Sequence, residues 1–198
     1  MIGLNTGNDQ TGFTVIELLI VALIIGILLA IAIPKLFVAR FSANEANTRK
    51  AMQTLRDGES LYFEQDLNDD GLRNYTSQIG NMTTGGTLRC PPSGGNCTEE
   101  DSLVDSTFEG AVSTGALADC VDPKAGYCIQ FASDVDATDP LTLQAEYGWE
   151  ASMTSARKTG RRDFAVYADG VIRCALSLEI IGDPGVFQAD RTSTACDG

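Results

Sequence analysis

Residues 12–34 read GFTVIELLIVALIIGILLAIAIP, and this stretch decides the fold. Its last sixteen residues before Pro34 carry no charge and directly follow a single acid, Glu17. As a helix, residues 13–33 would be about 32 Å long at ~1.5 Å per residue. That length crosses the hydrocarbon core of a bilayer, so the sequence predicts a transmembrane helix over residues 13–33.

A carboxylate beside such a run costs roughly 2.5–3.5 kcal/mol on insertion scales, so a helix that only anchored the chain would have no reason to carry Glu17. The order Gly-Phe-Thr-Val-Ile-Glu at 12–17, followed by the apolar run and Pro34, resembles the start of type IV pilins and pseudopilins. The resemblance implies that a prepilin peptidase cuts after Gly12 and methylates the new N-terminus, Phe13. It further implies that Phe13 and Glu17 act in assembly and that Pro34 bends the helix.

Residues 1–12, MIGLNTGNDQTG, are polar and are predicted to be a removable prepilin leader peptide. The leader contains no Lys or Arg, unlike those of the family it resembles, and Lys35 and Arg40 lie on the side of the apolar run that opposes the usual orientation rule. An ordinary secretory signal is the alternative, because Ala-Ile-Ala at 30–32 looks like a cleavage site. The uncharged start, and Glu17 where apolar residues should begin, argue against it.

Residues 34–65 are expected to continue the helix as an amphipathic half, with Pro34 removing one hydrogen bond and bending the helix without ending it. At ~100° per residue, six side chains fall within a stripe about 80° wide. They are Phe37, Phe41, Thr48, Met52, Leu55 and Tyr62. The polar residues Arg40, Asn47, Lys50 and Asp57 lie off this stripe. The pattern predicts that a folded head packs on the stripe.

The head has two parts. Residues 66–125 are rich in Gly, Thr, Ser, Asn and Asp and are predicted to be loops, with a short helix near 103–108. Residues 126–198 hold the strand patterns and a hairpin turn at Asp169-Gly170. The expected strands are Gly126–Ala132, Leu143–Met153, Phe164–Tyr167 and Val171–Cys174, an order that also resembles the sheet of pilin-like heads. The predicted fold class is α+β, with a long helix packed on an antiparallel sheet.

All six cysteines follow the apolar segment, which predicts an oxidising compartment and up to three disulfides. Six cysteines allow 15 connectivities. The preferred set pairs those nearest in sequence: Cys90–Cys97, Cys120–Cys128 and Cys174–Cys196. The last pair would pin the C-terminal segment, as a disulfide often does in the heads that this chain resembles.

The charge is unevenly distributed. Residues 1–65 hold six acids and five bases, whereas residues 66–198 hold 21 acids and nine bases, for a net charge of −12. Such a head repels phosphate backbones, so no general nucleic-acid binding is expected. The run Arg157–Arg162 is the main basic feature of the head. A solvated turn is the simpler interpretation, and contact with an acidic neighbouring subunit is the favoured functional one.

The sequence contains no histidine and no nucleotide-binding or nucleophile motif, so neither enzymatic activity nor a cofactor is predicted. Asp66, Asn68 and Asp70 match the first half of a calcium loop, but Ser77 stands where the closing Glu belongs. A solvated acidic turn explains them as well, and no metal site is predicted.

Taken with the resemblance, these features predict a structural subunit that polymerises with itself into a type IV pilus for adhesion, twitching motility or DNA uptake. Its other partners would be the prepilin peptidase and an assembly platform in the inner membrane. The precursor would span that membrane once and the product would be an extracellular fibre. A pseudopilin of a type II secretion system is the main alternative, and an ordinary secreted binding protein the third.

Overall fold

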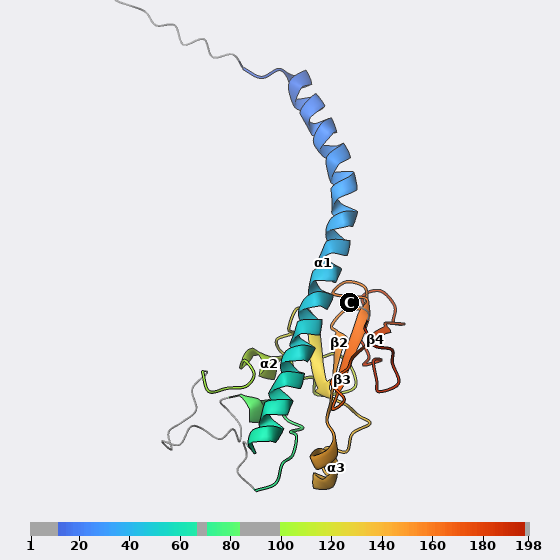
Figure 1. The fold of residues 1–198 in the computed structure, drawn as a ribbon. Coiled ribbons are helices and arrows are strands. Elements are labelled where there is room, and N and C mark those ends of the chain that lie inside the picture. The colour runs from blue at the N-terminus through green and yellow to red at the C-terminus, as the bar shows by residue number, and fades with distance from the viewer. Residues whose placement is uncertain (1–11, 67–70, 84–99, 197–198) are drawn as a thin grey trace, which may run out of the picture. The chain divides into compact units, whose positions relative to one another are not determined.

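The computed structural model describes residues 12–66, 71–83 and 100–196 (Figure 1). It consists of two compact units that divide between Ala39 and Arg40. The first helix, α1 (Val15–Gln65), contributes residues to both units.

In the first unit, α1 is apolar and its side chains are exposed throughout. It is the one helix among the described residues that is long and apolar enough to cross a membrane. The helix continues through Pro34, as predicted. The missing N–H of a proline affects one carbonyl, here that of Ala30, and the remaining hydrogen bonds keep the helix intact.

The second unit is the head, and its centre is a four-stranded antiparallel sheet in the order β1-β2-β3-β4. The strands are β1 (Tyr127–Phe131), β2 (Gly148–Met153), β3 (Arg162–Tyr167) and β4 (Ile172–Leu176). Consecutive strands pair with one another, as in a meander, and Gly170 closes the β3–β4 hairpin at φ +72°. The α+β prediction is confirmed.

Three short helical elements connect these parts: η1 (Ile79–Met82), α2 (Thr107–Gly110) and α3 (Pro140–Ala145). The expected strand over 143–153 is therefore too long, because its first three residues belong to α3. Asp139 caps this helix by accepting from the Leu141 N–H at 3.0 Å, and Pro140 occupies its first turn. An Asp-Pro pair is a helix-start signal that outweighs the β-propensity of the residues after it. The expected helix near 103–108 likewise begins later, at Thr107.

The stripe on α1 packs against the sheet, with two corrections. Thr48, Met52, Leu55 and Tyr62 are buried, and the last three share one core with Trp149 and other sheet residues. Phe37 was expected in this stripe but is 52% exposed, and Phe41 is only half-buried. The stripe therefore begins effectively at Thr48. Ala51, Gly58 and Glu59 are also buried on this helix, and a side chain at Gly58 would lie 2.9 Å from Val104.

Both edges of the sheet are covered. On the β1 side, the Ile129 N–H donates to the Ala111 carbonyl at 2.8 Å and the Ile129 carbonyl accepts from Ser113 N–H at 2.7 Å. On the β4 side, the Cys174 N–H donates to Thr194 O, and the Cys196 N–H donates to Ile172 O, each at 2.9 Å. The two straps satisfy backbone groups that an edge strand otherwise leaves open.

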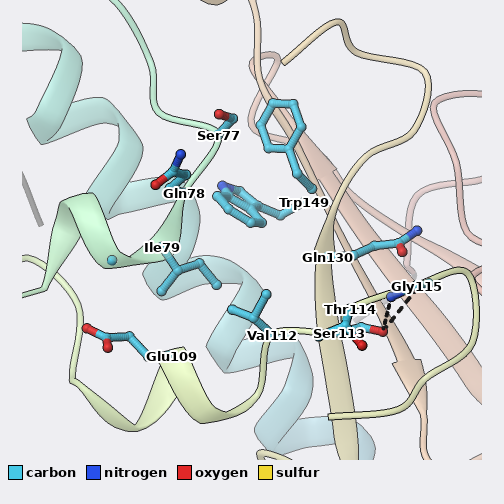
Figure 2. A pocket seen from close by; sticks show the side chains of 12 residues that line it. Ser77, Gln78, Ile79, Glu109, Val112, Ser113, Thr114, Gly115, Gln130 and Trp149 are labelled. Carbon is cyan, nitrogen blue, oxygen red and sulfur yellow. Dashed lines mark hydrogen bonds between the residues drawn. The ribbon is translucent and has the colours of Figure 1, made fainter. Parts of the chain in front are cut away.

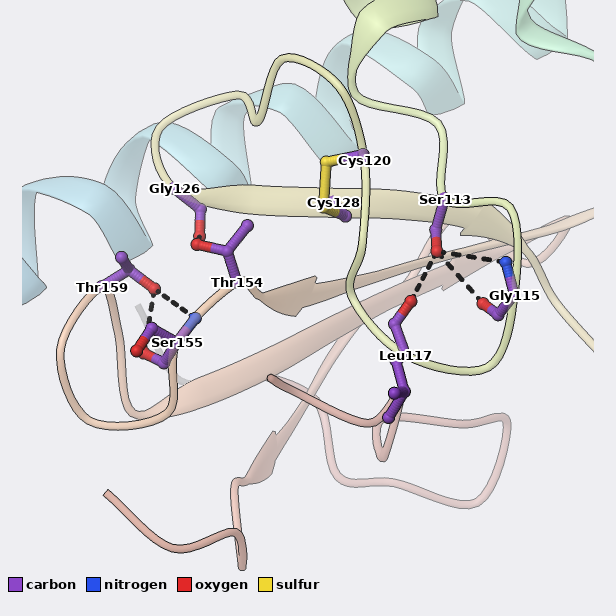
Figure 3. The surroundings of a disulfide bond; sticks show 9 residues. All are labelled: Ser113, Gly115, Leu117, Cys120, Gly126, Cys128, Thr154, Ser155 and Thr159. Atoms are coloured by element: carbon purple, nitrogen blue, oxygen red, sulfur yellow. Dashed lines mark hydrogen bonds between the residues drawn. A yellow bond between two sulfur atoms is a disulfide. The ribbon is translucent and has the colours of Figure 1, made fainter. Parts of the chain in front are cut away.

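Each edge strand also carries a disulfide. Cys120 bonds to Cys128 of β1, beside the loop that contains Ser113 and Leu117 (Figure 3). Cys174 of β4 bonds to Cys196 near the C-terminus. Cys90 and Cys97, the third expected pair, lie outside the described residues.

We expect the Cys174–Cys196 disulfide to stabilise the head by about 3 kcal/mol, because its 22-residue separation restricts the unfolded chain. The variant Cys174→Ala/Cys196→Ala should therefore unfold at a lower urea concentration. Trp149 is the single tryptophan and is buried, so its fluorescence reports the transition. Cys120→Ala/Cys128→Ala opens a smaller loop and should cost slightly less. Equal midpoints for wild type and the first variant would contradict this prediction.

Candidate functional site

The residues around the expected cleavage position form a closed first turn of α1. Thr14 precedes the helix, and both its N–H and its hydroxyl donate to Oε2 of Glu17, each at 2.8 Å. In return, the Glu17 N–H donates to the Thr14 hydroxyl oxygen at 3.3 Å. This reciprocal pair is a capping box, which satisfies N–H groups that a helix N-terminus leaves without partners.

The capping box gives Glu17 a purpose that the sequence interpretation missed. A Thr-x-x-Glu pattern before an apolar run is the signal for it, and the pattern is present at 14–17. Both Thr14 donors use the same carboxylate oxygen. Among the residues that the structure describes, Oε1 of Glu17 has no hydrogen-bond partner, so half of the carboxylate remains available.

Gly12 and Phe13 lie before the helix in open surroundings. No atom lies within 4 Å of the place where a side chain at Gly12 would begin, and Phe13 is 84% exposed. An accessible peptide bond between them can be reached by a peptidase. Whether it is cut there remains a prediction, as do the assembly function of Phe13 and Glu17 and the bend at Pro34.

The head contains a feature that the sequence interpretation did not single out, a fully buried carboxyl group. Oε1 of Glu59 accepts from Trp149 Nε1 at 2.8 Å and Oε2 accepts from Thr76 N–H at 3.0 Å. Burial raises the pKa of Glu59 to about 8, although these two hydrogen bonds oppose the rise. Glu59 ties α1 to the sheet and to the loop before η1. Its position four residues after Leu55 and three before Tyr62 places it on the apolar face, and that spacing was the available signal.

Two more carboxyl groups in the sheet share this property. Glu150 accepts from Gln130 Nε2 at 2.8 Å, and Asp163 accepts from Ser152 Oγ at 2.9 Å. Burial raises the pKa of each to about 7. A carboxyl group whose pKa is raised by folding binds its proton more tightly in the folded state. Stability from these groups is therefore greatest below about pH 4 and is lost as pH rises to about 8.

We expect the free energy of unfolding of the head to fall, by on the order of 3 kcal/mol, between pH 5 and pH 8. The measurement is urea unfolding at both pH values, followed by Trp149 fluorescence. Glu59→Gln keeps an acceptor oxygen and removes the ionisation, so its stability should depend less on pH and should exceed that of wild type at pH 8. A wild-type head that is more stable at pH 8 than at pH 5 would contradict the assignment of buried, neutral carboxyl groups.

A pocket of about 540 Å³ opens between η1, the end of β1 and the loop at 112–115. Glu109 and Gln130 lie on opposite sides of it, with Trp149 between η1 and β1 (Figure 2). Ser113 lines it but uses its hydroxyl to bond to Gly115 and Leu117. Glu109 is the one ionisable residue among those that line the pocket, and Ser77, Ser113 and Thr114 contribute hydroxyl groups.

The two remaining sequence hypotheses have different outcomes. Of the half calcium loop, the structure describes Asp66 alone, which accepts from Gly71 N–H at 3.1 Å, whereas Asn68 and Asp70 lie outside the described residues. In the described part of the chain no cluster of three or more metal-ligating acids or cysteines occurs. Arg161 and Arg162, from the basic run, line a groove beside α1, together with Arg49.

Comparison with known protein families gives a match at the N-terminal end of the chain. A family model described as the prokaryotic N-terminal methylation motif matches residues 7–33, which include the capping box and the whole apolar run before Pro34. No curated protein and no solved structure is significantly similar to the chain.

Proposed function

The chain carries the N-terminal signature of the type IV pilin and pseudopilin family, and from this premise we propose that it is a structural subunit of a type IV pilus. The precursor spans the inner membrane through residues 13–33 and is cut and methylated at Phe13. Processed copies then polymerise through this apolar segment into a surface fibre. The observation that carries the proposal is the match at residues 7–33, a segment in which every described apolar side chain is exposed and available for packing.

The capping box supports a specific assembly contact. Oε2 of Glu17 is used within its own chain, and Oε1 remains for a neighbour. Cleavage creates an amine at Phe13, and an ion in an apolar bundle strongly prefers an opposite charge. The Phe13 amine of one copy therefore pairs with Glu17 of the next. The pair fixes how far one helix slides past another, and it forms only after processing.

The head supports a pilus rather than a pseudopilin. Its two disulfides and covered sheet edges suit a domain that is exposed outside the cell. A pseudopilin would use the same N-terminal chemistry in a short fibre that stays with the secretion system. Electron microscopy of sheared surface material, with identification of its protein, distinguishes the two: long fibres made of this chain support the pilus.

Gly12→Val should leave an uncut precursor in the inner membrane, because a β-branched side chain cannot enter a peptidase site that accepts glycine. Intact-mass measurement gives the result directly: wild type should begin at methylated Phe13, and the variant should retain residues 1–12. Gly26→Val is the matched control. It places the same side chain where nothing lies within 4 Å, and it should be cut normally.

A mature N-terminus at Ile33 would instead identify an ordinary secretory signal. That mass would refute both the pilus and the pseudopilin.

A further inference from the structure

The head has a basic groove at one end of β3. The groove encloses about 470 Å³ and is lined by Arg49, Arg161 and Arg162 together with Ser42, Glu45, Ala46 and Leu176. The lining thus holds three arginines and one acid, Glu45. Oε1 of Glu45 accepts the Arg161 backbone N–H at 2.8 Å.

The groove is positioned by packing. The Arg161 guanidinium lies 5.5 Å from the centre of the Phe41 ring, which holds it against α1. In the described part of the chain neither Arg161 nor Arg162 forms an ion pair. This concentration of positive charge is unusual here, because residues 40–198 contain 25 acids and 13 bases.

An acidic loop lies at the opposite end of the same strand. Residues 133–139 read SDVDATD. Val135 is buried and anchors the loop, while Asp136 is exposed and Asp139 half-buried. The Thr138 N–H and hydroxyl donate to Oδ1 of Asp136 at 2.9 and 2.7 Å, which lowers the pKa of Asp136 and keeps it ionised. Asp139 is fixed by its bonds to α3.

Strand β3 connects the two features. It begins at Arg162, in the groove, and ends at Tyr167, whose hydroxyl donates to Oδ1 of Asp134 at 3.2 Å. Five residue steps at ~3.4 Å separate these ends by about 17 Å. Arg191 pairs with Asp134 and leaves Asp136 and Asp139 without a cation among the described residues.

Two complementary surfaces at opposite ends of one domain cannot satisfy each other within one copy. They can do so between copies, and each contact leaves one groove and one loop free for the next. Such a head-to-tail contact joins copies into a ring or an open filament rather than a two-fold dimer. Opposite charges at both surfaces also determine which partner is accepted.

We propose that the groove of one copy binds the 133–139 loop of a second copy, with Arg161 and Arg162 paired to Asp136 and Asp139. This contact would join neighbouring heads. It rests on the proposed function, because the copies that it joins are those that also pack through their N-terminal helices. The partner is therefore a second copy of this chain, recognised by its paired carboxylates.

The test reverses each surface in the full-length protein. Neither Arg161→Glu/Arg162→Glu nor Asp136→Lys/Asp139→Lys should associate with itself, and each should give about tenfold fewer fibres, the effect of ~1.4 kcal/mol per contact. A mixture of the two restores both opposite-charge contacts, so it should recover fibres and, in detergent at low salt, association measured by sedimentation. Arg157→Glu/Lys158→Glu is the control, with the same charge change outside the groove lining.

Two further measurements keep the result interpretable. Asp136→Asn/Asp139→Asn removes the charges but keeps side chains that cap well, so a loss of association there cannot be a folding defect. Trp149 fluorescence checks that every variant is folded. If wild type associates with itself in a salt-sensitive manner but forms no fibres, the proposed pilus is refuted and the contact between heads is supported.

If wild type forms fibres and both charge-reversal variants form as many, the contact between heads is refuted but the proposed pilus is not. The contact would also be overturned by a mixture that fails to recover association. A third result would also overturn the contact: the protein binds duplex DNA, only Arg161→Glu/Arg162→Glu abolishes this binding, and self-association is unchanged. The groove would then bind DNA rather than a second copy.

Discussion

Glu17→Leu should give a chain that is inserted and cut but that forms few or no fibres. The substitution removes the charge that we propose to pair with the Phe13 amine of a neighbour, so nothing polar would fix the register of the apolar helices. Intact mass should still show a methylated N-terminus, while electron microscopy of sheared material should show almost no filaments. Normal fibres from this variant would show that Glu17 does not set the register.

The capping box makes a single variant insufficient, because Glu17→Leu also removes the bonds to Thr14. Glu17→Gln separates the two effects: glutamine can still close the box but has no charge. Thr14→Ala does the opposite, opening the box and keeping the charge. Assembly through the ion pair predicts that Glu17→Gln fails and Thr14→Ala forms fibres. The reverse result would assign the assembly defect to an open first helical turn.

Leu55→Asp is expected to destabilise the head by several kcal/mol, about 4 or more, which is enough to unfold a domain of ordinary stability. Leu55 is fully buried in the core between α1 and the sheet, and an aspartate there would be a charge without a partner. Urea unfolding of the full-length protein in detergent, followed by Trp149 fluorescence, measures the loss.

Leu61→Asp is the matched control, because it introduces the same residue on the same helix where the side chain is 42% exposed. It should change stability by less than about 0.5 kcal/mol. Equal unfolding midpoints for Leu55→Asp and wild type would refute the packing of α1 on the sheet.

The parts of the fold that could be predicted are those set by local chemistry. The apolar helix follows from its length and composition, and the β3–β4 hairpin from Asp169-Gly170, where φ is positive at the glycine. The helical stripe was predicted because buried side chains recur at helical spacing. Phe37 was wrongly included in this stripe. Periodicity identifies the apolar face of a helix, but it does not show where along the helix the folded head begins to cover that face.

The carboxyl groups were harder to interpret. Burial of Glu59 depends on Trp149, which is 90 residues away and becomes a hydrogen-bond donor only once the sheet has formed. The Thr-x-x-Glu pattern of the capping box is present at 14–17, but Glu17 was interpreted only as an assembly residue. The basic run was visible in the sequence, whereas the acidic loop at 133–139 was not singled out, and only strand β3 places the two at opposite ends of one domain.

The covered edges of the sheet would have a consequence in the crowded fibre that we propose. An exposed edge strand is a template for pairing with the same strand of another molecule, and such pairing leads to irreversible aggregation. Here Ala111 and Ser113 bond to the backbone groups of Ile129 in β1, and Thr194 and Cys196 bond to those of Cys174 and Ile172 in β4. The disulfide on each edge strand keeps the adjoining segments from peeling away. Crowded heads can therefore meet through side chains alone, which keeps their association reversible.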